Sequence, residues 1–224
     1  GDYLDNVSFE GFTIQNGMTS AGIGGGGILV HEFSNPTIIN CIITGNSSPQ
    51  GGGLSSTDLS DPILIDCSFI GNQSFFGGGI YNDWGHLYLE NCTFDNNSAH
   101  RTSTSSDSGC GGAIYLEGFG DGEFKGCTFS NNTAEYWGGA VECEFTDGNQ
   151  FIDCIFQNNS SAFYGGAVDL YTYCGVSFTG CYFSSNSSEK GGAVSFPYTL
   201  EVDARTNLLI LYSLQSSNKF KVPM

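Results

Sequence analysis

The feature that most constrains this chain is a Gly-Gly-small-aliphatic tetrapeptide that occurs seven times along the sequence. The copies begin at Gly25, Gly51, Gly77, Gly111, Gly138, Gly165 and Gly191. Their spacings are 26, 26, 34, 27, 27 and 26 residues. A repeat of this length is typical of a solenoid, in which each repeat forms one coil that stacks on its neighbours.

A second element, Cys-x-Phe-x-x-Asn, lies between the tetrapeptides. It occurs at Cys67/Phe69/Asn72, Cys92/Phe94/Asn97, Cys127/Phe129/Asn132, Cys154/Phe156/Asn159 and Cys181/Phe183/Asn186, and with Ile for Phe at Cys41/Ile43/Asn46. Residues two apart share one side of a strand, and no apolar pattern persists at helical spacing. Short strands that recur every ~26 residues bury their apolar sides only when coils stack. The sequence therefore predicts an all-β parallel β-helix of about seven coils with three parallel sheets.

Three side chains of the second element are predicted to be structural. The Asn side chains should stack as a hydrogen-bonded ladder, and the Phe rings should form one internal column. Stacked Cys residues would lie at the ~4.8 Å strand spacing, farther apart than the ~3.8 Å between the Cβ atoms of a disulfide, so we expect free, buried thiols. The predicted ladder comprises Asn46, Asn72, Asn97, Asn132, Asn159 and Asn186.

The ends of the chain complete the expected organisation. Residues 198–224 follow the last repeat and fit no coil, so we expect one β-helix domain over residues 1–197 and an irregular tail or cap over residues 198–224. The chain begins without Met or an apolar leader, which favours a processed protein or a piece cut from a longer one. Its longest apolar run, residues 208–212, is far shorter than the ~20 residues of a membrane-spanning helix. We therefore expect no transmembrane segment.

The charge of the chain limits its partners. Six Lys and Arg against 23 Asp and Glu leave a formal net charge of -17. The phosphates of nucleic acid and the anionic faces of membranes would be repelled by such a surface. We expect no nucleic-acid partner.

The combination of Phe-x-x-Asn with Gly-Gly-Ala-Ile/Leu/Val resembles the repeats of the chlamydial polymorphic outer membrane proteins. More broadly, residues 6–196 resemble the pectin-lyase-like right-handed β-helix superfamily. The first resemblance implies a secreted adhesin, and the second implies a right-handed coil. Sugar-cleaving relatives carry clustered Asp with His and an Arg/Lys pair, or a calcium-binding acidic site with a catalytic Arg, and neither set is recognisable in this sequence.

Alignment of the coils on the tetrapeptide places carboxylates in two columns that point outward from one sheet. We expect a solvent face of an acidic rod, with calcium binding through oxygen ligands and glycoside cleavage by two carboxylates about 5 Å apart as the alternatives. Apart from calcium, no cofactor is expected. The residues are Asp83, Glu117 and Glu144 in one column, Glu142 and Asp169 in the column two residues earlier, and Tyr81 and Tyr115 below them.

Two further sets of surface residues are candidates. One coil is longer by about eight residues, and residues 101–109 form a polar loop of the kind that carries binding functions. His100 and Arg101 are its cationic residues and would contact an acidic partner. If the source is eukaryotic, Asn91, Asn96, Asn131 and Asn158 are the glycosylation acceptors expected to face water.

We interpret the sequence as a secreted or cell-surface, non-catalytic β-helix that acts in adhesion or as a structural module, with glycans or a surface receptor as partner. One alternative is a subunit of an extracellular filament, in which copies pair end to end through open sheet edges. Another is a lyase or hydrolase acting on polysaccharides. The non-catalytic interpretation is favoured because the cations within the repeats, Lys125 and Lys190, stand at different repeat positions and form no cluster.

Overall fold

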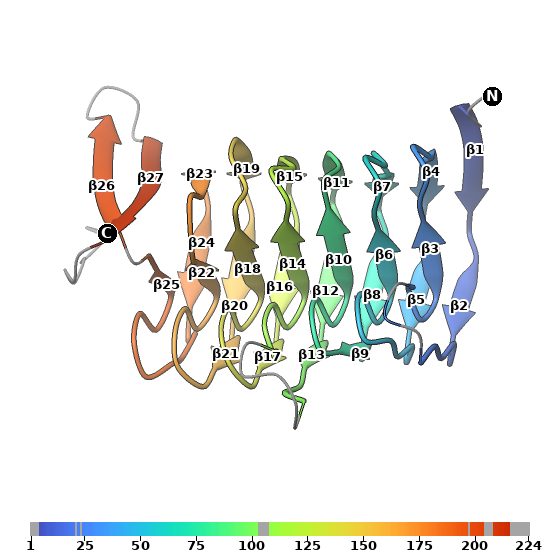
Figure 1. The fold of residues 1–224 in the computed structure, drawn as a ribbon, viewed down its shortest axis with the longest axis horizontal. Coiled ribbons are helices and arrows are strands. Elements are labelled where there is room, and N and C mark those ends of the chain that lie inside the picture. Colours follow the sequence, from blue (N-terminus) through green and yellow to red (C-terminus); the bar gives the residue numbers. More distant parts are fainter. Residues whose placement is uncertain are drawn as a thin grey trace.

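The computed structural model describes residues 5–20, 22, 24–102, 108–196, 198–203 and 208–215. These residues form a parallel β-solenoid whose coils stack side by side into a rod (Figure 1). No helix occurs among them, and each full coil contributes a strand to each of three long sheets. The predicted all-β parallel solenoid of about seven coils is confirmed.

Sheet A contains nine strands, and its parallel part carries the large apolar residue that precedes each Cys. The side chains of Ile38, Leu64, Leu89, Phe124 and Phe151 point into the core and are fully buried. Its strands, in spatial order, are β1 (Asp5–Glu10), β4 (Asn35–Ile39), β7 (Ile63–Ile65), β11 (Leu87–Glu90), β15 (Gly122–Lys125), β19 (Asn149–Ile152), β23 (Gly175–Thr179), β27 (Leu208–Gln215) and β26 (Tyr198–Asp203).

Sheet B carries the aromatic column and is followed by a short fourth sheet that we did not predict. Its strands are β2 (Thr13–Gln15), β5 (Ile42–Thr44), β8 (Ser68–Ile70), β12 (Thr93–Asp95), β16 (Thr128–Ser130), β20 (Ile155–Gln157) and β24 (Tyr182–Ser184). Sheet C adds the two-residue strands β9 (Gln73–Ser74), β13 (Ser98–Ala99), β17 (Thr133–Ala134) and β21 (Ser160–Ser161).

Sheet D begins directly after the glycine pairs and closes each coil. The first glycine of a pair takes a left-handed backbone, as at Gly111 with φ of 66°. The second lies against the next coil, since a Cβ on Gly112 would overlap the carbonyl oxygen of Gly139. Both positions therefore need glycine. The strands are β3 (Ile28–Val30), β6 (Leu54–Ser56), β10 (Ile80–Asp83), β14 (Ile114–Glu117), β18 (Val141–Glu144), β22 (Val168–Leu170) and β25 (Val194–Ser195).

The predicted phenylalanine column lies inside the rod. In-register pairing places Phe94 between Phe69 and Phe129, and the rings stack with centroids 4.9 and 5.0 Å apart. Phe156 and Phe183 continue the stack at 4.7 Å steps. Rings of sheet A meet this column edge to face, so the core is dense in aromatic contacts.

The predicted asparagine ladder is also confirmed. The backbone N–H and the Nδ2 of Asn97 both donate to Oδ1 of Asn132, at 3.0 and 3.1 Å. The same Nδ2 also donates to the carbonyl oxygen of Phe69, at 2.9 Å. The pattern repeats from Asn46 to Asn186, and the first five members are fully buried.

The cysteines form no disulfides, and five of the six repeat cysteines are buried as expected, whereas Cys181 on the last coil is half-buried. Each repeat thiol lies at the corner between sheets A and B, where it donates to backbone carbonyls. The Sγ of Cys92, for example, lies 3.5 Å from the carbonyl oxygens of Leu64 and Glu90.

The segment after the last coil, expected from the sequence to be an irregular tail or cap, contains two strands. Strand β27 pairs with β23 in antiparallel orientation, and β26 pairs with β27. These two strands extend sheet A beyond the final coil and act as a cap on that sheet (Figure 1).

Candidate functional site

The candidate site lies on the outer face of sheet D. Strand pairing places Tyr81, Tyr115, Glu142 and Asp169 in one column. It also places Asp83, Glu117 and Glu144 in a second column two residues further along each strand. Both predicted columns exist, and all five predicted carboxylates lie on this face.

The prediction that this face is open to solvent is wrong for the first column. Tyr81 and Tyr115 are 4% exposed, Asp169 is 3% exposed and Glu142 is 1% exposed. The cause is the segment that precedes each tetrapeptide, which folds over the column and covers it with bulky side chains such as Phe76 and Trp137. The carboxylates of the second column are half-buried.

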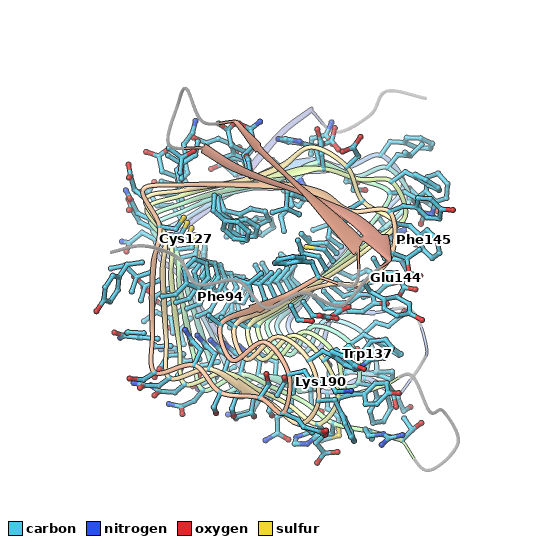
Figure 2. All side chains as sticks on the ribbon, turned by 90° about the vertical axis from the view of Figure 1, so that its left-hand side faces the viewer. Phe94, Cys127, Trp137, Glu144, Phe145 and Lys190 are labelled. Atoms are coloured by element: carbon cyan, nitrogen blue, oxygen red, sulfur yellow. The ribbon has the colours of Figure 1, made fainter. Side chains whose placement is uncertain are left out.

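The covering segment and the sheet enclose a groove of about 410 Å³. Phe76 meets the ring of Tyr115 edge on at 5.3 Å, and Trp137 stacks on Tyr171 at 4.5 Å. In the end-on view, Phe145, Glu144 and Trp137 follow one another down this side of the rod (Figure 2). The groove is lined by Gln50, Phe76, Tyr81, Cys110, Tyr115, Glu117, Trp137, Glu144 and Tyr171.

Two tyrosine–glutamate pairs supply the polar groups of the groove. The hydroxyl of Tyr81 donates to Oε2 of Glu117 at 2.9 Å, and that of Tyr115 donates to Oε2 of Glu144 on the next coil. Burial, followed by the charge of the partner glutamate, raises the pKa of both phenols. The hydroxyls therefore remain donors, and the carboxylates can accept further hydrogen bonds from a ligand.

Glu142 and Asp169 form a buried acidic pair behind the groove. They are partners on adjacent strands, and neither carboxyl oxygen of Glu142 has a hydrogen-bond partner within the described structure. Burial raises the pKa of Asp169 to about 7, and burial followed by the charge of Asp169 raises the pKa of Glu142 well above its usual value. Glu142 therefore holds a proton to higher pH than a solvent-exposed glutamate does.

This acidic pair should make stability depend on pH. A carboxyl whose pKa is raised in the folded state contributes stability that is fully present below its unfolded pKa of about 4 and is lost as pH rises through the folded value. We expect Glu142→Gln to raise the free energy of unfolding at pH 8 relative to wild type, because Gln carries no charge that burial disfavours. At pH 4 the difference should vanish. Urea denaturation at both pH values measures it.

The exposed Asp153 offers a matched control for this measurement. Asp153→Asn removes one negative charge and keeps a side chain that tolerates the left-handed backbone at this position, where φ is 53°. Its effect should be equally small at both pH values. If Glu142→Gln behaves in the same way, the buried pair does not titrate as described.

The alternative of a calcium site gains no support from the arrangement of ligands. Within the described residues, no group of three or more His, Cys, Asp or Glu side chains is placed to hold a metal ion. Glu117 and Glu144 line the groove, whereas Asp83 lies beside Glu117 outside the lining. Glu142 and Asp169 are buried behind the groove. Burial, followed by the charge of Glu117, raises the pKa of Asp83 to about 6.

The two cationic residues of the long coil lie against the next coil. Nδ1 of His100 is 3.3 Å from a carboxylate oxygen of Glu135, and the backbone N–H of Arg101 donates to the other oxygen at 2.7 Å. The guanidinium of Arg101 lies 4.7 Å from the ring centroid of Tyr136. Residues 103–107 of the predicted loop lie outside the described residues.

The structure agrees with the expected exposure of the glycosylation acceptors. Asn91, Asn96, Asn131 and Asn158 are exposed and take left-handed backbones at the corners of the coils. Attachment of sugar to them remains a prediction.

Sequence reasoning missed the residues that cover the acidic face. Phe76, Cys110 and Trp137 each directly precede a tetrapeptide, and Tyr171 continues the column of Glu117 and Glu144. The available signal was the bulky residue before the glycine pair, which also recurs as Gln50, Tyr164 and Lys190. Alignment of the repeats alone does not reveal that this residue folds back over the sheet.

The parallel pairing of the stacked coils defines a β-helix protein, and the groove lies on the outer face of one of its sheets. The family model described as "Right handed beta helix region" matches residues 4–202, so the chain belongs to this family. The match and the solenoid support the pectin-lyase-like β-helix that the repeats resemble. Neither the curated proteins nor the solved structures give a significant match. The described part of the chain has no helix with the length and hydrophobicity needed to cross a bilayer.

Proposed function

We propose that this protein is a secreted or cell-surface, non-catalytic β-helix that binds saccharides in the groove of sheet D and acts in adhesion. The observation that carries the proposal is the pairing of aromatic walls with two tyrosine–glutamate pairs in one groove. The C–H faces of a sugar ring pack on aromatic rings, while its hydroxyls donate to carboxylates. A groove with apolar walls and a few oriented polar groups is the usual form of a small-molecule site. The resemblance to secreted adhesin repeats agrees with this role.

Neutral saccharides fit the groove better than acidic ones. The described lining contains Glu117 and Glu144 and no Lys, Arg or His. The formal net charge of the chain is -17, so a uronate polymer would be repelled both locally and by the surface as a whole. Uncharged hydroxyls would instead form charge-assisted hydrogen bonds with the two glutamates.

One observation favours the alternative of a polysaccharide-active enzyme. Asp83 lies beside Glu117 in register, and its pKa is raised to about 6, as for an acid that works together with an ionised carboxylate. Asp83 is not part of the groove lining, however, and Glu117 is engaged by Tyr81. We therefore favour binding without cleavage.

Isothermal calorimetry with a panel of neutral oligosaccharides and oligogalacturonate tests this proposal. We expect saturable binding of a neutral member, and Glu144→Gln should weaken it about tenfold because it replaces a charged acceptor with a neutral one. Tyr182→Thr, at an exposed aromatic on sheet B, is the control and should bind as wild type. New reducing or unsaturated ends that appear with wild type and disappear in Glu117→Gln would establish the enzyme instead. Absence of any saccharide binding would refute the proposal.

The filament alternative rests on the first coil. Phe12 and Met18 are exposed there, and β1, β2 and β3 are edge strands of their sheets. Edge strands of this kind pair readily with a further strand, from an adjoining coil or from a second chain. Electron micrographs that showed fibres of the purified protein would support a filament subunit.

A further inference from the structure

A second feature of the molecule has no part in the groove. One corner of the rod, after sheet D, carries a large apolar side chain on six successive coils, seven or eight residues after each glycine pair begins. Five of these side chains are between 47% and 70% exposed, and that of Phe145 is half-buried. We name this column the aromatic ridge, and it consists of Phe33, Leu59, Trp84, Phe119, Phe145 and Tyr173.

All six ridge residues take the left-handed backbone, with φ between 50° and 63°. This conformation is unfavourable for bulky residues and is usually given to Gly, Asn or Asp. The chain follows that rule at its other corners, with Ser185 as the exception. These corners carry Asn40, Asp66, Asn91, Gly126, Asp153 and Gly180 in one column and Asn16, Gly45, Gly71, Asn96, Asn131, Asn158 and Ser185 in another. The ridge breaks the rule on every one of these coils while exposing its side chains. Backbone preference does not favour bulky residues at these left-handed positions, and their exposed side chains point to a role in binding.

The ridge is continuous along the rod. Ring centroids lie 5.5 Å apart between Trp84 and Phe119, 6.3 Å between Phe119 and Phe145, and 6.1 Å between Phe145 and Tyr173. Each step is comparable to the length of one pyranose unit in an extended chain. In the end-on view Phe145 projects from a corner of the section, so the ridge is convex (Figure 2).

Carboxylates flank the ridge on both sides. Asp83, Glu117 and Glu144 lie one or two residues before it at the end of strands of sheet D, and the exposed Asp121 and Asp147 follow it. Anionic lipid surfaces and acidic polymers would be repelled by these charges. Hydroxyl groups would donate to them while apolar C–H faces pack on the rings.

We propose that the aromatic ridge binds the flat surface of an insoluble, neutral polysaccharide such as a β-linked glucan or chitin. The ridge is convex and only one side chain wide, so it cannot enclose a single polysaccharide chain. Its ligand must therefore be a flat surface on which the whole row of rings can lie. The sugar rings exposed at the face of such a solid form a flat surface. Their spacing along each polysaccharide chain is close to the spacing of the ridge rings from coil to coil. This site goes beyond the groove and does not depend on it.

Depletion of the protein by microcrystalline cellulose and by chitin particles tests this inference. We expect wild type to leave the supernatant with at least one of the two solids. The double variant Trp84→Asn/Phe119→Asn should lower the partition coefficient at least about tenfold, since stacking contacts with aromatic rings are lost. Asn suits the left-handed backbone, so the fold should be kept, and thermal unfolding checks this. Tyr173→Asn, at the most exposed ridge position, provides a second variant should the double variant unfold.

Two controls separate this site from the groove. Tyr182→Thr removes an exposed aromatic elsewhere on the rod, and Phe76→Leu removes an aromatic wall of the groove; both should bind the solids as wild type. The inference fails if wild type remains in the supernatant with both solids, or if the ridge variants bind as tightly as wild type. It also fails if the ridge variants lose binding only to anionic vesicles. Failure of soluble saccharides to bind the groove in calorimetry would leave the ridge result unaffected.

Discussion

Replacing Phe129 with Ala should lower the free energy of unfolding by about 3–5 kcal/mol, the usual loss for a large buried aromatic. The ring is fully buried and stacks between Phe94 and Phe156, with centroids 5.0 and 4.7 Å away. The neighbouring coils hold their rings in register, so they cannot close the cavity without breaking strand pairs. Urea denaturation followed by circular dichroism measures the loss.

Phe12 provides the matched control, because the same substitution there removes a ring that is 56% exposed. Phe12→Ala should change the free energy of unfolding by no more than about 0.5 kcal/mol, as is usual at the surface. An equal effect of the two substitutions would mean that the phenylalanine column does not carry the stability of the rod.

Replacing Asn132 with Ala should lower the free energy of unfolding by about 3 kcal/mol or more, since each buried group left without a partner costs about 1–3 kcal/mol. The substitution removes the acceptor of the backbone N–H and Nδ2 of Asn97 and the donor to the carbonyl oxygen of Phe94. It also removes the Nδ2 of Asn132 that donates to Oδ1 of Asn159. Hydrogen exchange of the Asn97 amide should accelerate together with the loss of stability.

The neighbouring Asn131 offers a sharp comparison, because it is exposed and has a left-handed backbone with φ of 56°. Gly45 and Gly71 occupy the equivalent position on other coils, so Asn131→Gly should be tolerated with little loss of stability. If Asn132→Ala and Asn131→Gly lowered the free energy of unfolding by similar amounts, the ladder would not depend specifically on the inward-facing Asn132.

The sequence predicted the features that depend on residues stacking on their own equivalents. The Phe column and the Asn ladder follow directly from a repeat in which each coil places the same residue at the same point. The cover over the acidic face could not be predicted in this way, because it depends on how the residue before each glycine pair, such as Trp137, folds back onto a neighbouring column. Glu142 was therefore expected in solvent and is buried.

The ridge and the strands of the C-terminal segment escaped prediction for different physical reasons. Backbone preference predicts Gly or Asn at a left-handed corner, and Phe119 and Tyr173 stand there against that preference. The last strands, β26 and β27, carry no repeat signature, because they follow no coil: β27 pairs with β23 and β26 pairs with β27, both in antiparallel orientation.

The most direct test of saccharide binding in the groove uses the two tryptophans of the chain. Trp137 lines the groove and Trp84 belongs to the ridge, so their indole N–H signals in a nitrogen-correlated NMR spectrum report the two sites separately. Trp84→Phe assigns the two signals. The protein is titrated with the neutral oligosaccharide that binds in calorimetry. The Trp137 signal should shift until it saturates, and the oligosaccharide should keep its length throughout the titration. A Trp137 signal that stays in place while the sugar binds elsewhere, or a sugar that is shortened during the titration, would contradict the account.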